Sequence, residues 1–136
     1  MLNDIDMTVS ELYSEDLETC LDSVVNLTAL RGKAVLITGA TGMIGSFMVD
    51  ALMHGNRNMG LDCVVVAMGR SEEKARRRFD NYWNDEKFVF VQHDVNFPIP
   101  EDSLPGWGRN PPPFVRIIPQ LPRRCSWVRT GRRTCP

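Results

Sequence analysis

The stretch Thr38-Gly-Ala-Thr-Gly-Met-Ile-Gly-Ser46 decides the fold of this 136-residue chain. Its three glycines stand three residues apart, at Gly39, Gly42 and Gly45. The apolar run 34–37 comes directly before them and is typical of a central parallel strand, which is covered on both faces. Apolar residues recur at helical spacing from 44 to 53, directly after them. The stretch therefore predicts a strand, a tight turn and a helix.

The spacing of the glycines indicates a turn that receives a phosphate group. Such a tight turn needs a residue that is free to adopt positive φ. A pyrophosphate approaches the backbone only where no Cβ intrudes, and the last glycine lets the helix lie close to the strand. The helix N-terminus then offers N–H groups and its positive dipole end to the phosphates. A P-loop would need a lysine after its last glycine, but Ser46 follows Gly45, so a dinucleotide site is predicted instead.

Two more strands and a helix continue this pattern. The run Cys63–Met68 predicts a second buried strand, residues 71–83 a helix with Ser71 as its N-cap, and Phe88–Gln92 a third strand. This order, without hairpin turns, predicts an α/β fold with a partial Rossmann-type, doubly wound parallel sheet of about three strands. One sheet edge would then lack its fourth strand. Phe114–Ile118 can form a short strand, but nothing in the sequence predicts that it covers this edge.

Composition divides the chain into residues 1–30, 31–100 and 101–136. The first part contains seven acidic side chains and no Lys or Arg. It predicts an acidic helix over 9–25 that packs on the edge of the domain. Its apolar positions are Leu12, Leu17, Cys20, Leu21, Val24 and Val25. We expect the second part to be the partial Rossmann domain that binds the dinucleotide. The third part is an irregular Pro/Arg-rich tail, which we expect to be largely disordered beyond residue 118.

The overall charge and the N-terminus narrow the partners and the compartment. The formal net charge of −1 gives the chain no electrostatic reason to bind nucleic acid or an anionic membrane. No apolar run approaches the roughly 18 residues of a membrane span. The acidic N-terminus lacks a signal-peptide profile, so we expect a cytoplasmic protein. Its cysteines have no zinc-like spacing, so we expect free thiols and no metal site at Cys20, Cys63, Cys125 and Cys135.

The segment 33–46 resembles the extended short-chain dehydrogenase/reductases, and among them the NAD-dependent epimerase/dehydratase group that acts on nucleotide sugars. The family motif T-G-x-x-G-x-[IL]-G is matched at Thr38, Gly39, Gly42, Ile44 and Gly45. The resemblance covers roughly residues 30–98 and implies that NAD or NADP is the cofactor. It implies that the backbone of Gly42, Met43 and Ile44 meets the pyrophosphate, with Thr41 in the same turn.

The same resemblance points to residues after the third strand. The segment His93-Asp-Val95 is similar to the family's G-D-[LV] motif, which implies that Asp94 and Val95 contact the adenine. The alternative for Asp94 is an ordinary turn residue at a strand end.

The end of the second strand bears on the choice between NAD and NADP. An acidic residue there would bind the ribose 2′-OH of NAD. This chain has Arg70 instead and no acid before Glu72. A guanidinium can bind a 2′-phosphate in a bidentate, charge-assisted contact, which favours NADP. The alternative is a solvated arginine at the helix start, and the basic residues 74–78 are read as a solvated helix face.

The residues that would use the cofactor are missing from this sequence. The family's chemistry needs a Tyr-x-x-x-Lys pair, but Leu17 stands four residues after Tyr13, and Glu86 four residues after Tyr82. No catalytic residue is therefore assigned, and the family's fourth strand is not recognised soon after Asp94. We expect a cofactor-binding fragment without turnover, its nucleotide sugar being a partner in the parent family only. The alternative is a non-catalytic dinucleotide-binding or sensor module that acts through a protein partner.

The abrupt change of composition near residue 100 has two explanations. All nine prolines lie from Pro98 onward and no lysine follows Lys87. Either a natural short module carries an unrelated tail, or the coding sequence has slipped frame near residue 100. The abruptness favours the second. Translation of the gene in its other two frames tests this, since one of them should resume a strand and later a Tyr-x-x-x-Lys pair.

Overall fold

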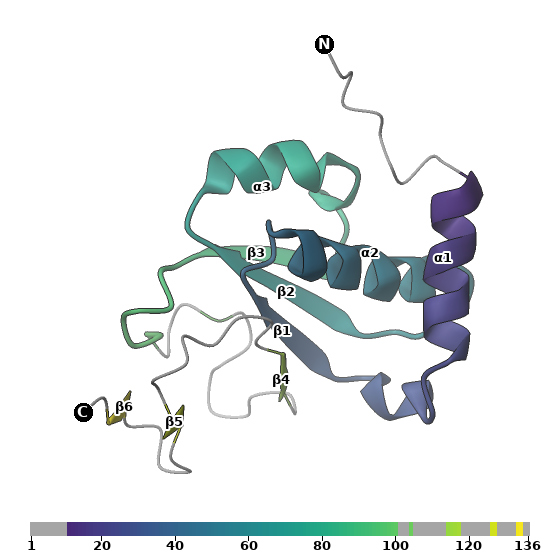
Figure 1. Ribbon diagram of the computed structural model, residues 1–136, viewed down its shortest axis with the longest axis horizontal. Coiled ribbons are helices and arrows are strands. Elements are labelled where there is room, and N and C mark those ends of the chain that lie inside the picture. Colours follow the sequence, from purple (N-terminus) through teal and green to yellow (C-terminus); the bar gives the residue numbers. More distant parts are fainter. Residues whose placement is uncertain (1–10, 101–103, 105–113, 118–125, 128–132, 135–136) are drawn as a thin grey trace.

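The computed structural model describes residues 11–100, 104, 114–117, 126–127 and 133–134. Its main sheet has four parallel strands in the order β3-β2-β1-β4, with helices α2 and α3 on one face (Figure 1). The elements are α1 (Glu11–Asp22), η2 (Leu27–Leu30), β1 (Ala34–Thr38), α2 (Met43–Asn58), β2 (Val64–Gly69), α3 (Glu72–Arg78), η3 (Asp80–Tyr82), β3 (Phe88–Gln92), β4 (Phe114–Ile117), β5 (Ser126–Trp127) and β6 (Arg133–Thr134).

Strands β1 and β2 form the centre of the sheet because both of their faces are covered. Every residue of β1 is buried, and so is every residue of β2 after Val64. On one face, Val35 and Ile37 pack in one cluster with Phe79, next to α3, and with α2 residues. On the other face, Leu36 packs in a cluster that includes Ile99 and Leu104. The expected α/β fold with a partial Rossmann-type parallel sheet is confirmed.

The expectation that one edge of the sheet lacks a partner strand is wrong, whereas the possible short strand at Phe114–Ile118 does form. Strand β4 pairs in parallel with β1, from Ala34 opposite Phe114 to Ile37 opposite Ile117. The edge of β1 is therefore paired. The order β3-β2-β1-β4 places β4 on the side of β1 where the strand order of a Rossmann sheet reverses direction. The strand lacks a strong sequence signal because it is only four residues long.

Helix α2 is longer than the sequence predicts. The apolar spacing predicts this helix only over residues 44–53, but α2 runs on through Gly55 and Asn56 to Asn58. Tertiary packing explains the difference, since a Cβ on Gly55 would lie 3.1 Å from Leu61 Cδ2. The Asn56 side chain bonds both backbone groups of Cys63, donating to its carbonyl at 2.8 Å and accepting from its N–H at 2.9 Å. The glycine thus makes room inside the helix, while the asparagine ties the helix to the start of β2.

The predicted helix over 71–83 is divided into α3 and the short helix η3. Ser71 is its N-cap as expected, and its Oγ accepts a hydrogen bond from Lys74 N at 3.3 Å. Tyr82 is buried and Trp83 packs against the same core, so both residues join this segment to the sheet.

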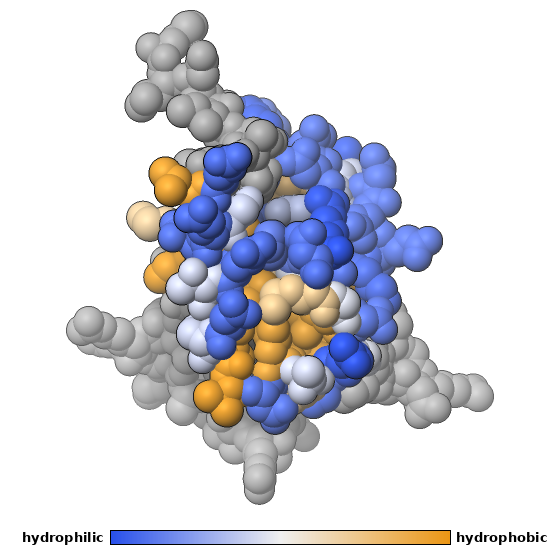
Figure 2. Space-filling model, turned by 90° about the vertical axis from the view of Figure 1, so that its right-hand side faces the viewer, coloured by the Kyte–Doolittle hydropathy of each residue, from blue (hydrophilic) through white to orange (hydrophobic). Residues whose placement is uncertain are grey.

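The acidic helix α1 packs on the side of α2, as its pattern predicts. Leu17 and Leu21 are buried against Ala51 of α2. The predicted packing does not extend to the two ends of the apolar pattern, where Leu12, Val24 and Val25 are exposed. Helix α1 ends at Asp22, so the last two lie beyond it. Figure 2 shows this side of the molecule largely covered by hydrophilic residues, with hydrophobic ones between them.

Only part of the Pro/Arg-rich tail, residues 101–136, belongs to the described part of the chain. Residues 126–127 and 133–134 form the short antiparallel pair β5–β6, so the expected irregular tail holds some strand structure. The other residues beyond 118, including Cys125 and Cys135, lie outside the described part of the chain. Cys20 and Cys63 are both free, as expected. None of the described helices is long and apolar enough to cross a membrane.

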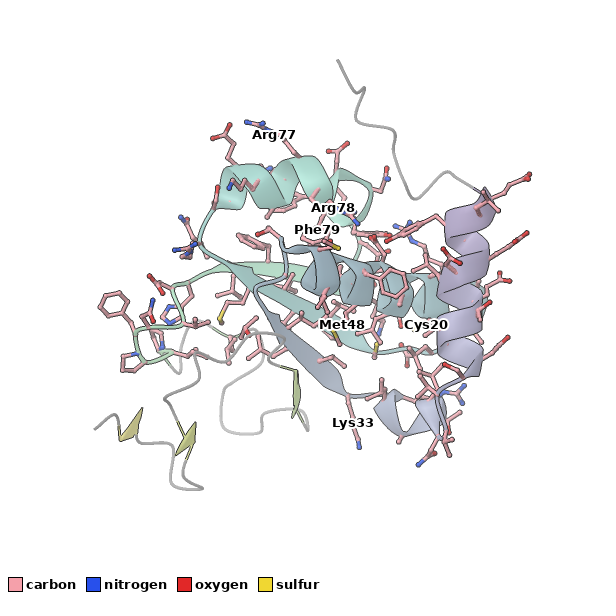
Figure 3. The ribbon with its side chains drawn as sticks, in the orientation of Figure 1. Cys20, Lys33, Met48, Arg77, Arg78 and Phe79 are labelled. Atoms are coloured by element: carbon pink, nitrogen blue, oxygen red, sulfur yellow. The ribbon has the colours of Figure 1, made fainter. Side chains whose placement is uncertain are left out.

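A buried carboxylate joins three helical segments around α2. Asp50 lies in α2 and is fully buried. It accepts hydrogen bonds from the hydroxyls of Tyr13 in α1 at 2.6 Å and Tyr82 in η3 at 3.0 Å. Arg78 of α3 completes the cluster as a bidentate ion pair with both carboxylate oxygens. In Figure 3, Arg78 lies on the side of α3 that faces α2, whereas Arg77 points away.

This cluster predicts a loss of stability in alkali. Burial, followed by the hydrogen bond to Asp50, raises the pKa of Tyr13 from 10.0 to about 12. Tyr13 therefore stabilises the fold fully below its unfolded pKa of about 10, and this contribution is lost as the pH rises through about 12. In urea unfolding, the free energy of the wild type should fall more steeply over this window than that of Tyr13→Phe. Parallel curves would contradict the prediction.

Candidate functional site

The turn that follows β1 has the tight backbone conformation that its glycines predict. Gly39 has a φ of 62°, in the left-handed region that favours glycine. Its carbonyl accepts a hydrogen bond from Gly42 N at 3.0 Å, which closes the turn. Ala40 N donates to Met68 O at 3.0 Å, so the turn is also fixed to the end of β2.

Two of the glycines lie where a side chain would meet the backbone. A Cβ on Gly45 would lie 2.9 Å from Ala40 Cα, and closer still to the carbonyl oxygen of Gly39. A Cβ on Gly42 would lie 3.3 Å from the same oxygen. Helix α2 thus begins closely packed against the turn. A turn whose glycines lack Cβ atoms, set against a helix start, fits the approach of a pyrophosphate.

The N-terminus of α2 is open to an anion. Its N-cap, Gly42, has extended backbone and gives no side-chain cap, and the first turn contains no acidic residue. Met43 is 89% exposed and Ile44 is 60% exposed. The first N–H groups of a helix have no acceptor within the helix, and the dipole there favours negative charge. Backbone donors and helix dipole together can hold a phosphate group.

The ends of the first three strands meet beside this turn. A Cβ on Gly69, the last residue of β2, would lie 3.7 Å from Thr41 Cγ2. Gly69 O in turn accepts a hydrogen bond from His93 N, directly after β3, at 2.9 Å. The sequence-predicted residues therefore lie at the carboxyl edge of one parallel sheet, which is where ligands bind in folds of this class.

Arg70 lies exposed between β2 and α3, and its guanidinium has no acidic partner among the described residues. The neighbouring arginines differ, since Arg76 pairs with Glu72 and Arg77 with Glu73. Arg78, predicted to lie on a solvated face, instead pairs with the buried Asp50. Arg70 is thus the arginine of this segment whose charge remains available to an anion.

Asp94 and Val95 lie in a tight turn after β3. One carboxylate oxygen of Asp94 accepts hydrogen bonds from the backbone and the side-chain amide of Asn96, both at 2.9 Å. Phe97 N donates to Asp94 O at 3.0 Å. This arrangement favours the turn-residue interpretation for one oxygen of Asp94. The other has no partner within the described residues, and Val95 is 38% exposed, so both can still contact a ligand.

Two residues of the site region escaped the sequence analysis. Gln92 donates from its side-chain amide to Arg70 O at 3.0 Å. Asp50 lies in the helix that begins at the glycine turn, and it binds both described tyrosines. A single Gln at a strand end has no distinctive pattern. The sequence does give a signal for Asp50, because it is an acidic residue among the apolar positions 44–53. Across the described residues, no three His, Cys, Asp or Glu side chains gather as a metal site.

Comparison with known families agrees with this geometry. A model for an NAD-binding family, described as male sterility protein, matches residues 37–96. The match runs from the end of β1 to the turn after β3 and so includes the glycine turn, Arg70, Asp94 and Val95. The match agrees with the expected resemblance to a cofactor-binding domain over these residues, and it indicates NAD or NADP as the cofactor class. No curated protein matches the chain.

Proposed function

Because residues 37–96 match an NAD(P)-binding family, we propose that this chain is the cofactor-binding part of an oxidoreductase similar to nucleotide-sugar epimerases and dehydratases, and that it prefers NADP. The observation that carries the proposal is the glycine turn before α2. A Cβ at Gly45 would collide with the turn itself, while the helix N-terminus beside it is open. That combination suits a backbone cradle for a pyrophosphate.

The proposal gives each residue of the turn a role. The N–H groups of Gly42, Met43 and Ile44 donate to the pyrophosphate oxygens. Gly39 supplies the positive φ, and Gly45 allows the close packing of the helix. Thr41 lies next to the end of β2, where its side chain can contact the same ligand.

The adenosine half of the cofactor would extend toward the ends of β2 and β3. Arg70 would bind the 2′-phosphate, because its guanidinium is exposed and no described carboxylate neutralises it. The unengaged carboxylate oxygen of Asp94 would accept from the adenine amino group, and Val95 would contact the ring.

We propose that this chain binds the cofactor without catalysing turnover. The family's Tyr-x-x-x-Lys pair is absent from the sequence, and both described tyrosines are engaged with Asp50. The nucleotide sugar therefore belongs to the parent family. An assay with nucleotide sugars and either cofactor should show no product above background. We further propose a cytoplasmic location, which fits the free thiols of Cys20 and Cys63.

The proposal predicts that the preference for NADP over NAD depends on Arg70. We expect NADP and NADPH to raise the melting temperature of the wild type more than NAD and NADH do, because a ligand that binds only the folded state stabilises it. Arg70→Ala should weaken NADP binding by about 10- to 100-fold, as expected for charged hydrogen bonds of about 1.5–3 kcal/mol, and leave NAD binding unchanged. Isothermal titration calorimetry measures both affinities.

Arg77→Ala is the matched control. Arg77 is also exposed and lies seven positions further on, but it pairs with Glu73. Its loss should change neither affinity. No stabilisation by any of the four cofactor forms would refute the proposed function, whereas equal losses for NAD and NADP in Arg70→Ala would refute the role of Arg70 alone.

A further inference from the structure

A side chain from β3 fixes the backbone beside Arg70. Gln92 is the last residue of β3, and its Nε2 donates to Arg70 O at 3.0 Å. The register of the sheet pairs Gln92 with Gly69, the residue just before Arg70. The contact therefore joins the two strand ends one residue beyond the point where β2 stops.

The backbone on each side of Arg70 is also held. Gly69 O accepts a hydrogen bond from His93 N at 2.9 Å. Ser71 caps α3 and accepts from Lys74 N at 3.3 Å. Arg70 itself belongs to neither strand nor helix. Gln92 donates the hydrogen bond that the described residues give to the Arg70 carbonyl, and without it the peptide could rotate between its two fixed neighbours.

Rotation of this peptide matters because of the length of the arginine side chain. A guanidinium binds phosphate best when two N–H groups point at two oxygens at once, so its base must be fixed in direction. A side chain whose exposed end has no acidic partner depends on its backbone for this. An anchor at the Arg70 carbonyl would thus reduce the ordering cost of binding.

We propose that Gln92 is a positioning residue for cofactor selection: by holding the Arg70 carbonyl it directs the guanidinium to a ribose 2′-phosphate and so sets the preference for NADP over NAD. This inference rests on the proposed function. It concerns the ratio of the two affinities, not the ability to bind a dinucleotide, which the glycine turn supplies.

Gln92→Met tests it, since methionine has a similar length and no amide donor. The ratio of NADP to NAD affinity in calorimetry should fall about fivefold, the factor that corresponds to one neutral hydrogen bond of about 1 kcal/mol. In the Arg70→Ala background, Gln92→Met should leave the ratio unchanged, because the positioned group is gone. Lys87→Met, just before β3 at its opposite end, is the control and should not alter the ratio.

The outcomes separate this inference from the proposed function. A wild type that binds neither cofactor refutes both. A wild type that binds NADP, with an unchanged ratio in Gln92→Met, refutes the role of Gln92 alone, and so does an equal loss for both cofactors. A ratio that falls equally with and without Arg70 also refutes it, since Gln92 would then act on the ligand by another route. Unfolding of each variant without cofactor shows that the fold is retained.

Discussion

Alanine in place of Gly45 is expected to abolish NAD(P) binding and to destabilise the fold by about 1–3 kcal/mol. The added Cβ would lie 2.9 Å from Ala40 Cα and closer still to Gly39 O. Both neighbours are backbone atoms of the turn, so no side-chain rotation relieves the contact. The turn or the start of α2 must move, and the N–H groups of Met43 and Ile44 move with it. Calorimetry measures the affinity and urea unfolding the stability.

Gly55→Ala is the control for this change, because Gly55 is a second buried glycine of the same helix. There the Cβ would meet Leu61 Cδ2 at 3.1 Å, the far end of a flexible side chain. Alanine also favours a helix interior by about 1 kcal/mol, which offsets the repacking. We expect cofactor affinity to stay at the wild-type level. Wild-type affinity in Gly45→Ala would show that the backbone cradle is not the binding site.

The sequence predicts those parts of the fold and site that depend on local sterics and periodicity. Strands β1 to β3 appear within a residue of their expected bounds, because short apolar runs rich in β-branched or aromatic residues favour strands. The glycine turn is equally local. Its positive φ at Gly39 and the close packing at Gly45 follow from residues inside one nine-residue stretch.

The parts that escape prediction depend on partners distant in the chain. Strand β4 forms because the edge of β1 accepts it, and four residues contain too little pattern to show this. Helix α2 passes its expected end because Leu61 packs on Gly55 and Cys63 bonds to Asn56. The Gln92–Arg70 contact spans 22 positions and exists only in the register that β2 and β3 adopt.

Replacing Asp50 by alanine is expected to cost about 3 kcal/mol of unfolding free energy. Removal of one partner of a buried ion pair costs about 3–5 kcal/mol, because it leaves the other charge uncompensated. The lower end applies here since the Arg78 side chain keeps 30% exposure and can regain some water. The hydroxyls of Tyr13 and Tyr82 also lose their acceptor, and that of Tyr82 is buried. Urea unfolding at pH 7 measures the loss.

The same change should weaken cofactor binding only indirectly. Asp50 lies two helical turns after the start of α2. Its partners in α1, α3 and η3 hold this helix in place through their contacts with the carboxylate. Glu73→Gln breaks an exposed pair of the same α3 helix and should leave stability unchanged within error, as exposed pairs contribute little. If Asp50→Ala were as stable as Glu73→Gln, the buried cluster would not hold these helices. If it lost stability but kept wild-type affinity at a temperature where it is folded, the Asp50 cluster would stabilise the fold alone. The geometry of the phosphate turn would then depend on the backbone contacts of Gly39, Gly42 and Gly45.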